Sequence, residues 1–177
     1  GTCGTCKARR TEGDIHNSWP EAPGASYLKA ERNEFLMCQA IARSACEIEI
    51  RAAVEPGRGP LHKPAHGHAT ITRIDKLTHD VVAVHVELDR ALTFQAGQFI
   101  VMRAPGIAGY RAYSMVNFAP STKTLEFVLK RKPGGKFCDW IFAAEAAGAA
   151  LEWFGPLGKA TFDPGEQRTM LAIAGGS

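Results

Sequence analysis

Residues 54–67 constrain the fold more than any other stretch, because they carry three prolines and three glycines in fourteen positions. Proline lacks a backbone N–H and fixes φ, and glycine weakens regular structure, so this run excludes a helix or a central strand. We therefore expect an interdomain linker at 54–67. It divides the 177 residues into a first unit at 1–53 and a second unit that begins at 68.

The two units differ in their predicted secondary structure. The first is rich in turn-forming residues and ends on a run with period-two alternation, 46–51, which predicts a half-buried strand. The second predicts short strands rich in β-branched residues at 69–74, 81–88, 98–103, 111–116 and 124–130. Strands at this spacing favour an antiparallel barrel or a sandwich. The remainder predicts a helix at 136–147, a turn at 155–158 and a buried parallel strand at 170–174 that would open an α/β domain.

Charge and hydropathy argue against two classes of partner. No apolar run approaches the ~18–20 residues that span a bilayer, and the net charge of +3 is too small to argue for nucleic acid. Residues 51–140 nevertheless hold thirteen Lys or Arg against seven Asp or Glu. This basic middle suits an anionic ligand such as a diphosphate, although a solvated surface explains it equally well. Five cysteines, an odd number without the spacing of a small secreted scaffold, favour a reducing cytoplasm over disulfides.

Three of the cysteines form the pattern Cys3-x2-Cys6-x31-Cys38, with glycine beside the first two. Thiolates bind an iron–sulfur cluster when a tight loop gathers them, and glycine permits such a loop. The spacing and the local sequence resemble plant-type [2Fe–2S] ferredoxins, whose pattern is C-x4-C-x2-C with a distant fourth Cys. The resemblance implies that these are three of four cluster ligands, the first lying five positions before Cys3. A zinc site or unliganded cysteines are the alternatives; zinc would need a fourth ligand, and only His16 lies nearby.

Two further motifs suit an anionic heterocyclic ligand. The segment Arg111-Ala112-Tyr113-Ser114 is expected to be a strand with Arg111 and Tyr113 on one face. Arginine can bind phosphate in a bidentate manner, an aromatic ring can stack on a flat heterocycle, and Ser114 can reach a ring nitrogen. The glycine pair at 134–135 leads into the predicted helix, where exposed amides attract an anion. Taken alone, an ordinary edge strand and an ordinary loop-to-helix junction explain these motifs as well.

The order of the motifs is more specific than either of them. The R-x-Y-S motif is preceded by Phe94-Gln95-Ala96-Gly97-Gln98-Phe99, and the glycine pair follows it one strand later. The series ends with Gly155-Pro156-Leu157-Gly158 and then an apolar run that finishes in Gly175-Gly176-Ser177. This series resembles the ferredoxin–NADP reductase superfamily over residues 68–177.

The resemblance implies a role for each motif. Arg111 would contact the FAD diphosphate, Tyr113 would stack on the isoalloxazine ring, and Ser114 would bond near flavin N5. The glycine pair and the helix start would hold the phosphates, and the terminal Gly-rich turn would open the nicotinamide-binding loop. Cys138 departs from the Ser or Thr usual in the family, and a thiol is a weaker hydrogen-bond partner. The expected cofactor-binding residues are Arg111, Ala112, Tyr113, Ser114, Val128, Lys130, Gly134, Gly135, Lys136, Phe137, Cys138, Gly175 and Gly176.

A ferredoxin unit ahead of an FAD unit resembles the reductase components of multicomponent ring-hydroxylating dioxygenases and of hydrocarbon or phenol monooxygenases. The fold expected is mainly β and multidomain. It comprises a partial β-grasp [2Fe–2S] ferredoxin domain at 1–53, the linker at 54–67, a six-stranded antiparallel Greek-key FAD-binding β-barrel at 68–168, and the first strand of an α/β nicotinamide domain at 169–177. We expect the chain to be a fragment of such a protein, truncated at both ends.

The resemblance also implies a function. Electrons would pass from NAD(P)H through FAD and the [2Fe–2S] cluster to an oxygenase component or a ferredoxin, with no side chain acting as an acid or base. The nicotinamide site would lie mostly outside the fragment, which would then be inactive with NAD(P)H. Alternatives from other classes are a non-catalytic flavin- or cluster-binding module and a zinc-stabilised interaction domain.

Overall fold

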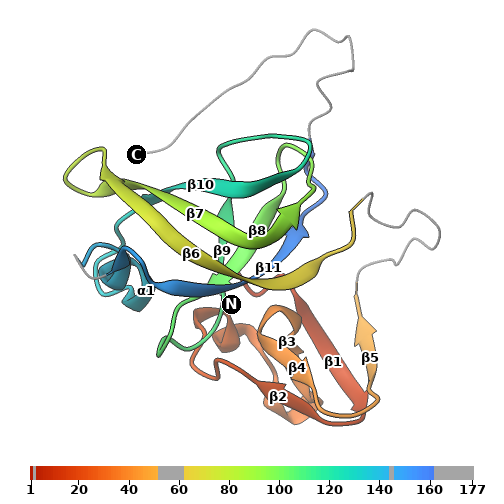
Figure 1. Cartoon of the computed structure of the whole chain (residues 1–177). Coiled ribbons are helices and arrows are strands. Elements are labelled where there is room, and N and C mark those ends of the chain that lie inside the picture. Colours follow the sequence, from red (N-terminus) through yellow and green to blue (C-terminus); the bar gives the residue numbers. More distant parts are fainter. Residues whose placement is uncertain (2, 52–61, 144–145, 162–177) are drawn as a thin grey trace, which may run out of the picture.

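The computed structural model describes residues 1, 3–51, 62–143 and 146–161, which form two units of β structure (Figure 1). We call residues 1–51 the cysteine unit and residues 62–161 the barrel unit. The predicted strand at 170–174, with Gly175 and Gly176 after it, lies outside the described residues, as do residues 54–61 of the predicted linker.

The cysteine unit consists of short strands and one-turn 3-10 helices. Antiparallel pairing gives a three-stranded sheet in the order β3-β1-β5 and a two-stranded sheet of β2 and β4. Among its described residues the buried apolar side chains are only Ala8, Ala22 and Leu36, so its core is small. Its elements are β1 (Lys7–Glu12), β2 (Ile15–Asn17), η1 (Pro23–Tyr27), η2 (Ala30–Arg32), β3 (Glu34–Leu36), η3 (Met37–Gln39), β4 (Ala40–Ala42) and β5 (Glu47–Ile50).

The barrel unit is a curled six-stranded antiparallel sheet in the order β10-β7-β6-β11-β8-β9, which confirms the predicted strand number and direction. The curl brings the two edges together, since the backbone N–H of Val116, just after β9, donates to the carbonyl of Glu126 in β10 at 2.9 Å. Its elements are β6 (Ala65–Lys76), β7 (Val81–Leu92), β8 (Phe99–Arg103), β9 (Arg111–Ser114), β10 (Thr122–Lys130), α1 (Lys136–Ile141) and β11 (Ala150–Leu157).

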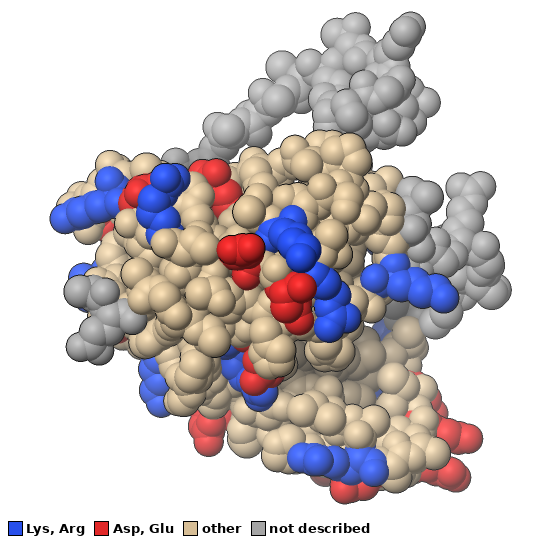
Figure 2. Space-filling model, viewed as in Figure 1, with Lys and Arg blue, Asp and Glu red and all other residues tan. Residues whose placement is uncertain are grey.

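The core of the barrel unit follows from the period-two pattern of its strands. Alternate residues of β7 and β10 point inward, and Val84 and Phe127 are 1% and 0% exposed. The largest fully buried side chain is Trp153, whose indole N–H donates to the carbonyl of His68 at 3.1 Å. Charged side chains of both signs are interspersed on the face seen in Figure 2. None of the helices in the described part of the chain has the length and apolar character needed to cross a membrane.

Helix α1 is shorter than the predicted helix at 136–147, because it ends at Ile141. The backbone that follows finds other partners. The N–H of Ala143 bonds the carbonyl of Trp140 in a tight turn, and the N–H of Gly148 bonds the carbonyl of Ile71 in β6 at 2.8 Å. Gly148 has a φ of +83°, which turns the chain toward that strand. The chain thus leaves the helix in a tight turn at Ala143 and is bonded to the sheet at Gly148.

Strand β11 runs through most of the segment predicted as a turn at 155–158, and that prediction is wrong as far as Leu157. The strand lies between β6 and β8, and its register with β8 shifts between Phe154 and Leu157, where Pro156 has no N–H to donate. A Cβ at Gly155 would lie 2.7 Å from Cγ2 of Ile100. Here the glycine allows two strands to pack closely, whereas glycine and proline together usually indicate a turn.

Two further expectations need correction. Strand β6 begins at Ala65, inside the run that was expected to exclude a central strand. The strand can form there because Gly67 has no side chain: a Cβ at Gly67 would lie only 2.6 Å from the Trp153 ring. The strand predicted at 46–51 is confirmed as β5, but its half-burial is wrong, since all four residues are exposed and Ile48 is 45% exposed. In the described part of the chain β5 pairs only with β1, as an edge strand.

Candidate functional site

Strand β9 presents the motif Arg111-Ala112-Tyr113-Ser114 at one edge of the six-stranded sheet, paired in register with β8. Arg111 and Tyr113 are half-buried, whereas Ala112 and Ser114 are exposed. This alternation is the one a strand imposes. The prediction that Arg111 and Tyr113 share one face is therefore confirmed.

The ring of Tyr113 rests on an aromatic base. It packs on Phe137 of α1, with centroids 5.4 Å apart and planes 32° apart, and it meets Phe127 of β10 at 6.5 Å. Phe137 and Phe127 are 2% and 0% exposed, so the core fixes this base. Burial raises the pKa of Tyr113, and the neighbouring Cys138 raises it further, so the phenol stays protonated at neutral pH.

The guanidinium of Arg111 lies beside the loop that precedes β9. Its Nη1 donates to the carbonyl oxygens of Ala108 and Tyr110, at 3.1 and 3.4 Å. Burial lowers the pKa of Arg111, although an arginine stays charged throughout the physiological range. Within the described ranges Nε and Nη2 donate to no protein acceptor, so these two donors are available to an anion.

The glycine pair leads the chain into α1 beside this face. Gly134 has a φ of +74°, and a Cβ there would meet no atom within 4 Å, so the space over the turn is open. Gly135 is the N-cap residue of α1. In the first turn of that helix, Phe137 carries the ring on which Tyr113 packs, and Cys138 is the next residue. The structure thus brings together predicted residues from β9, the glycine turn and α1.

Other predicted residues lie further out. The side chains of Val128, Lys130 and Lys136 are exposed on β10 and α1, and the Lys130 ammonium lies 3.9 Å from the carboxylate of Asp80. Ser114 is exposed at the end of β9.

The predicted metal ligands are partly gathered. The sulfurs of Cys6 and Cys38 lie 3.1 Å apart, although the residues are 32 positions apart in sequence. The thiol of Cys3 is exposed and lies 2.9 Å from the hydroxyl of Thr5, which lowers the pKa of Cys3. In the part of the chain that the structure describes, no three His, Cys, Asp or Glu side chains converge on one point. Two of the three predicted ligands are therefore adjacent.

A contact between the two units was not predicted. The side-chain amide of Gln39 bonds the backbone of Tyr110, and the Arg111 guanidinium carbon lies 3.5 Å from the ring centre of Trp19. No local pattern in the sequence marks Trp19 or Gln39, because their partners lie far along the chain. The one available signal was that Gln39 directly follows a predicted cluster ligand.

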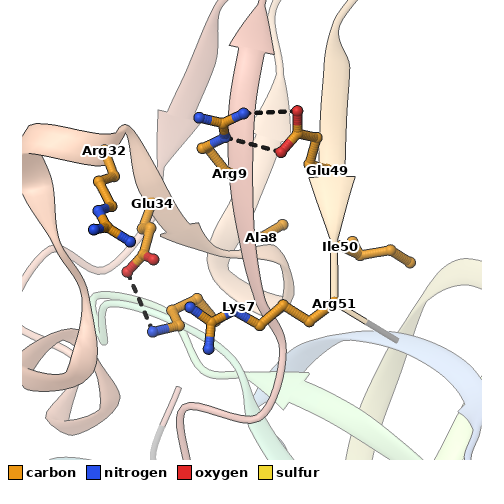
Figure 3. Close-up of a pocket in the computed structure, with 8 residues that line it drawn as sticks. All are labelled: Lys7, Ala8, Arg9, Arg32, Glu34, Glu49, Ile50 and Arg51. Carbon is orange, nitrogen blue, oxygen red and sulfur yellow. Dashed lines mark hydrogen bonds and ion pairs between the residues drawn. The ribbon is translucent and has the colours of Figure 1, made fainter. Parts of the chain in front are cut away.

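A pocket of about 310 Å³ lies on the cysteine unit, at the face of β1 and β5 (Figure 3). Lys7 pairs with Glu34 at 3.2 Å, and Arg9 pairs with Glu49 at 2.7 Å. The Arg9–Glu49 pair is exposed and contributes little to stability, whereas the side chains of Lys7 and Glu34 are largely shielded from solvent. The pocket includes none of the predicted cofactor-binding residues or cysteines.

Comparisons with known proteins match this geometry. Residues 68–162 match the family model described as an oxidoreductase FAD-binding domain. The whole chain is 37% identical to the ferredoxin–NAD(P)+ reductase CarAd of Metapseudomonas resinovorans and covers 54% of that protein. It is 35% identical to the ferredoxin–NAD+ reductase component of the alkene monooxygenase system of Xanthobacter autotrophicus and covers 53% of it. A solved structure of the ferredoxin reductase in carbazole 1,9a-dioxygenase superposes with a TM-score of 0.78 at 36% identity, over 93% of this chain and 49% of that one. The chain spans about half the length of the curated relatives it matches.

Proposed function

Because this chain belongs to the family of oxidoreductase FAD-binding domains, we propose that it forms the flavin and iron–sulfur part of an electron-transfer reductase. Such a reductase takes electrons from NAD(P)H and passes them to an oxygenase component or a ferredoxin. The observation that carries the proposal is that Arg111 and Tyr113 share one face of β9, where the Tyr113 ring packs on Phe137 of α1, the helix that follows the open turn at Gly134.

The residues on this face fit an FAD. Arg111 has two donors free for a diphosphate oxygen, Tyr113 offers a ring held from behind by Phe137, and Gly134 leaves a space that any other residue would fill. When bound, FAD supplies the change from a two-electron hydride donor to one-electron transfers. The protein binds and orients, and no side chain acts as an acid or base. We assign to FAD the residues Arg111, Ala112, Tyr113, Ser114, Val128, Lys130, Gly134, Gly135, Lys136, Phe137 and Cys138.

The cysteine unit supplies the exit for electrons in this proposal. Cys3, Cys6 and Cys38 would hold a [2Fe–2S] cluster, and the closeness of the Cys6 and Cys38 sulfurs, 32 positions apart in sequence, supports a shared role as ligands. Thiolates also bind zinc, so a zinc-stabilised interaction domain is the alternative. Visible absorption distinguishes the two, because a zinc site is colourless. Gly175 and Gly176 would begin the nicotinamide site.

The acceptor is proposed from the relatives. CarAd is a ferredoxin–NAD(P)+ reductase by name, and other relatives are named as reductase components of an alkene monooxygenase system and of a naphthalene 1,2-dioxygenase system. These names support an oxygenase component or a ferredoxin as the partner.

The flavin assignment is tested by Arg111→Ala. Loss of a charge-assisted bond to the diphosphate should cost about 1.5–3 kcal/mol, which is roughly a 10- to 100-fold weaker affinity for FAD. Quenching of flavin fluorescence in a titration measures that affinity. Arg90→Ala is the matched control, since Arg90 is exposed on β7, and it should leave the affinity unchanged. Equal affinity in Arg111→Ala and in the unmodified protein would remove Arg111 from the site.

A further inference from the structure

The side chain of Gln39 bridges the two units through a pair of hydrogen bonds. Its Nε2 donates to the carbonyl of Tyr110 at 3.4 Å, and its Oε1 accepts from the N–H of Tyr110 at 3.3 Å. The residues are 71 positions apart, and Gln39 is 3% exposed. A glutamine that satisfies both backbone groups of one residue acts as a single rung of a β-ladder, and it fixes the distance between the two chains.

The same side chain touches the cysteine pair. Its Nε2 lies 3.5 Å from the sulfur of Cys38, which in turn lies 3.1 Å from the sulfur of Cys6. On the other side, Tyr110 directly precedes Arg111. One carboxamide therefore separates a proposed cluster ligand from the start of the proposed flavin strand.

The indole of Trp19 forms the second half of the contact. The Arg111 guanidinium stacks on the indole, and its central carbon lies 3.5 Å from the centre of the Trp19 ring. Cation–π attraction is favourable at this distance. The indole also lies against the backbone of Gly109, where a Cβ would come 2.5 Å from Trp19 Cε3 and 2.8 Å from Gln39 Oε1. The N–H of Ser18 donates to the carbonyl of Gln39 at 2.8 Å, so Trp19 and Gln39 are tied to each other.

The barrel side of the contact is anchored. The hydroxyl of Tyr110 donates to Oε2 of Glu152 in β11 at 3.1 Å, and the Arg103 guanidinium pairs with the same carboxylate. Arg103 also lies over the Tyr110 ring, 5.1 Å from its centre. The backbone that Gln39 binds is thus held by β8 and β11.

We infer that Gln39 and Trp19 are positioning residues that hold the cysteine loop against strand β9 and so fix the separation of cluster and flavin. The inference rests on the proposed function. Each transfer moves one electron from reduced FAD to the oxidised cluster, and NAD(P)H supplies the two electrons to the flavin. Because the rate of electron transfer falls steeply with distance, a contact that sets the separation also sets the rate of this step.

The test compares variants of the cofactor-loaded reductase at the full length of its relatives, with the nicotinamide domain and the fourth cluster cysteine included. Gln39→Met keeps the length of the side chain and removes both hydrogen bonds, and Gln95→Met is the matched control on the barrel unit. Trp19→Leu removes the ring under Arg111, and Trp19→Phe keeps one. Amide hydrogen exchange at Tyr110 reports the contact directly, and stopped-flow absorbance separates reduction of the flavin by NAD(P)H from reduction of the cluster.

We expect Gln39→Met to speed exchange at Tyr110 about tenfold or more and to slow reduction of the cluster by about tenfold, since small displacements of reacting groups carry large kinetic costs. FAD affinity and the rate of flavin reduction should stay unchanged, a split that general destabilisation would not give. Trp19→Leu should also slow reduction of the cluster, Trp19→Phe should restore most of the rate, and Gln95→Met should change nothing. Iron analysis shows whether each variant keeps its cluster. If Gln39→Met loses iron, the comparison of Trp19→Leu with Trp19→Phe tests the inference instead.

Two results would overturn the inference. One is unchanged exchange at Tyr110 in Gln39→Met. The other is a cluster reduced at the unmodified rate in the Gln39→Met or Trp19→Leu protein that retains its iron. A full-length reductase with all four cysteine ligands that holds no flavin or no cluster before any substitution would instead contradict the proposed function, so the two failures are distinguishable.

Discussion

Phe127 supports the proposed flavin face from within the core. Its ring is fully buried in β10, and it meets the Tyr113 ring edge-on at 6.5 Å, with planes 65° apart. Aromatic pairs in this arrangement add to the free energy of burial. The orientation of Tyr113 therefore depends on a residue that touches no ligand.

We predict that Phe127→Ala lowers the free energy of unfolding by about 3–5 kcal/mol, because it leaves a cavity in a closely packed core. Urea denaturation followed by circular dichroism measures the change. Phe118→Ala is the matched control, since Phe118 is 51% exposed, and it should cost about 1 kcal/mol or less. A loss below 1 kcal/mol in Phe127→Ala would mean that the core relaxes into the space.

The sequence predicted residues of the site where the signal was local. Alternation along R-x-Y-S placed Arg111 and Tyr113 on one face, and that face is found. Gln39 and Trp19 escaped prediction because their partners at 109–111 lie on another unit. A contact between distant segments leaves no period and no motif in a single sequence.

At the scale of elements, strand β11 connects the parts of the barrel unit on which the site depends. It pairs with β6 and β8, and it carries Glu152, which binds both Arg103 and the hydroxyl of Tyr110. Strand alternation predicted the other strands within a few residues, but β11 was missed because its glycine and proline resemble a turn. The predicted length of α1 was too great because the composition after Ile141 favours a helix. In the structure, the backbone N–H of Gly148 instead bonds the carbonyl of Ile71 in β6.

The Glu152 network makes stability depend on pH. The hydrogen bond from Arg103, with a further bond from Tyr110, holds the pKa of Glu152 below its ordinary value of 4.5. A carboxyl group with a lowered pKa stabilises the fold above its unfolded pKa, and this stabilisation is lost as pH falls through the folded pKa. Because Glu152 is half-exposed, the effect is modest.

We therefore expect Glu152→Gln to destabilise the protein at pH 7 and progressively less below pH 4.5. Urea denaturation of both proteins from pH 3 to pH 7 measures the difference in free energy of unfolding. Glu87→Gln, an exposed change on β7, should give a difference close to zero at every pH. A Glu152→Gln difference that is constant with pH would assign the effect to packing instead of charge.

At the scale of the whole molecule, the two units differ in what stabilises them. The barrel unit buries a continuous cluster of apolar side chains that includes Ile71, Phe127 and Trp153. In the cysteine unit, the buried apolar side chains among the described residues are two alanines and Leu36. So small a core rarely stabilises a unit by itself, and metal–thiolate bonds are a common substitute. The fold class followed from the sequence, but this imbalance did not, because period-two patterns say nothing about how much a strand buries, as exposed β5 demonstrates.

We predict that removing the metal unfolds the cysteine unit and leaves the barrel unit folded. In the cluster-loaded protein with a fourth cysteine restored five positions before Cys3, which should be red-brown with about two irons per chain, chelation should abolish amide protection in β1, β3 and β5. Strands β6–β11 should stay protected and FAD should stay bound, because the barrel core contains no metal ligand. Removing FAD instead is the control, and it should leave the cysteine strands protected. Retained protection after chelation would mean that the small core and the contact with Tyr110 suffice, and a colourless protein containing zinc would contradict the ferredoxin assignment of Cys3, Cys6 and Cys38.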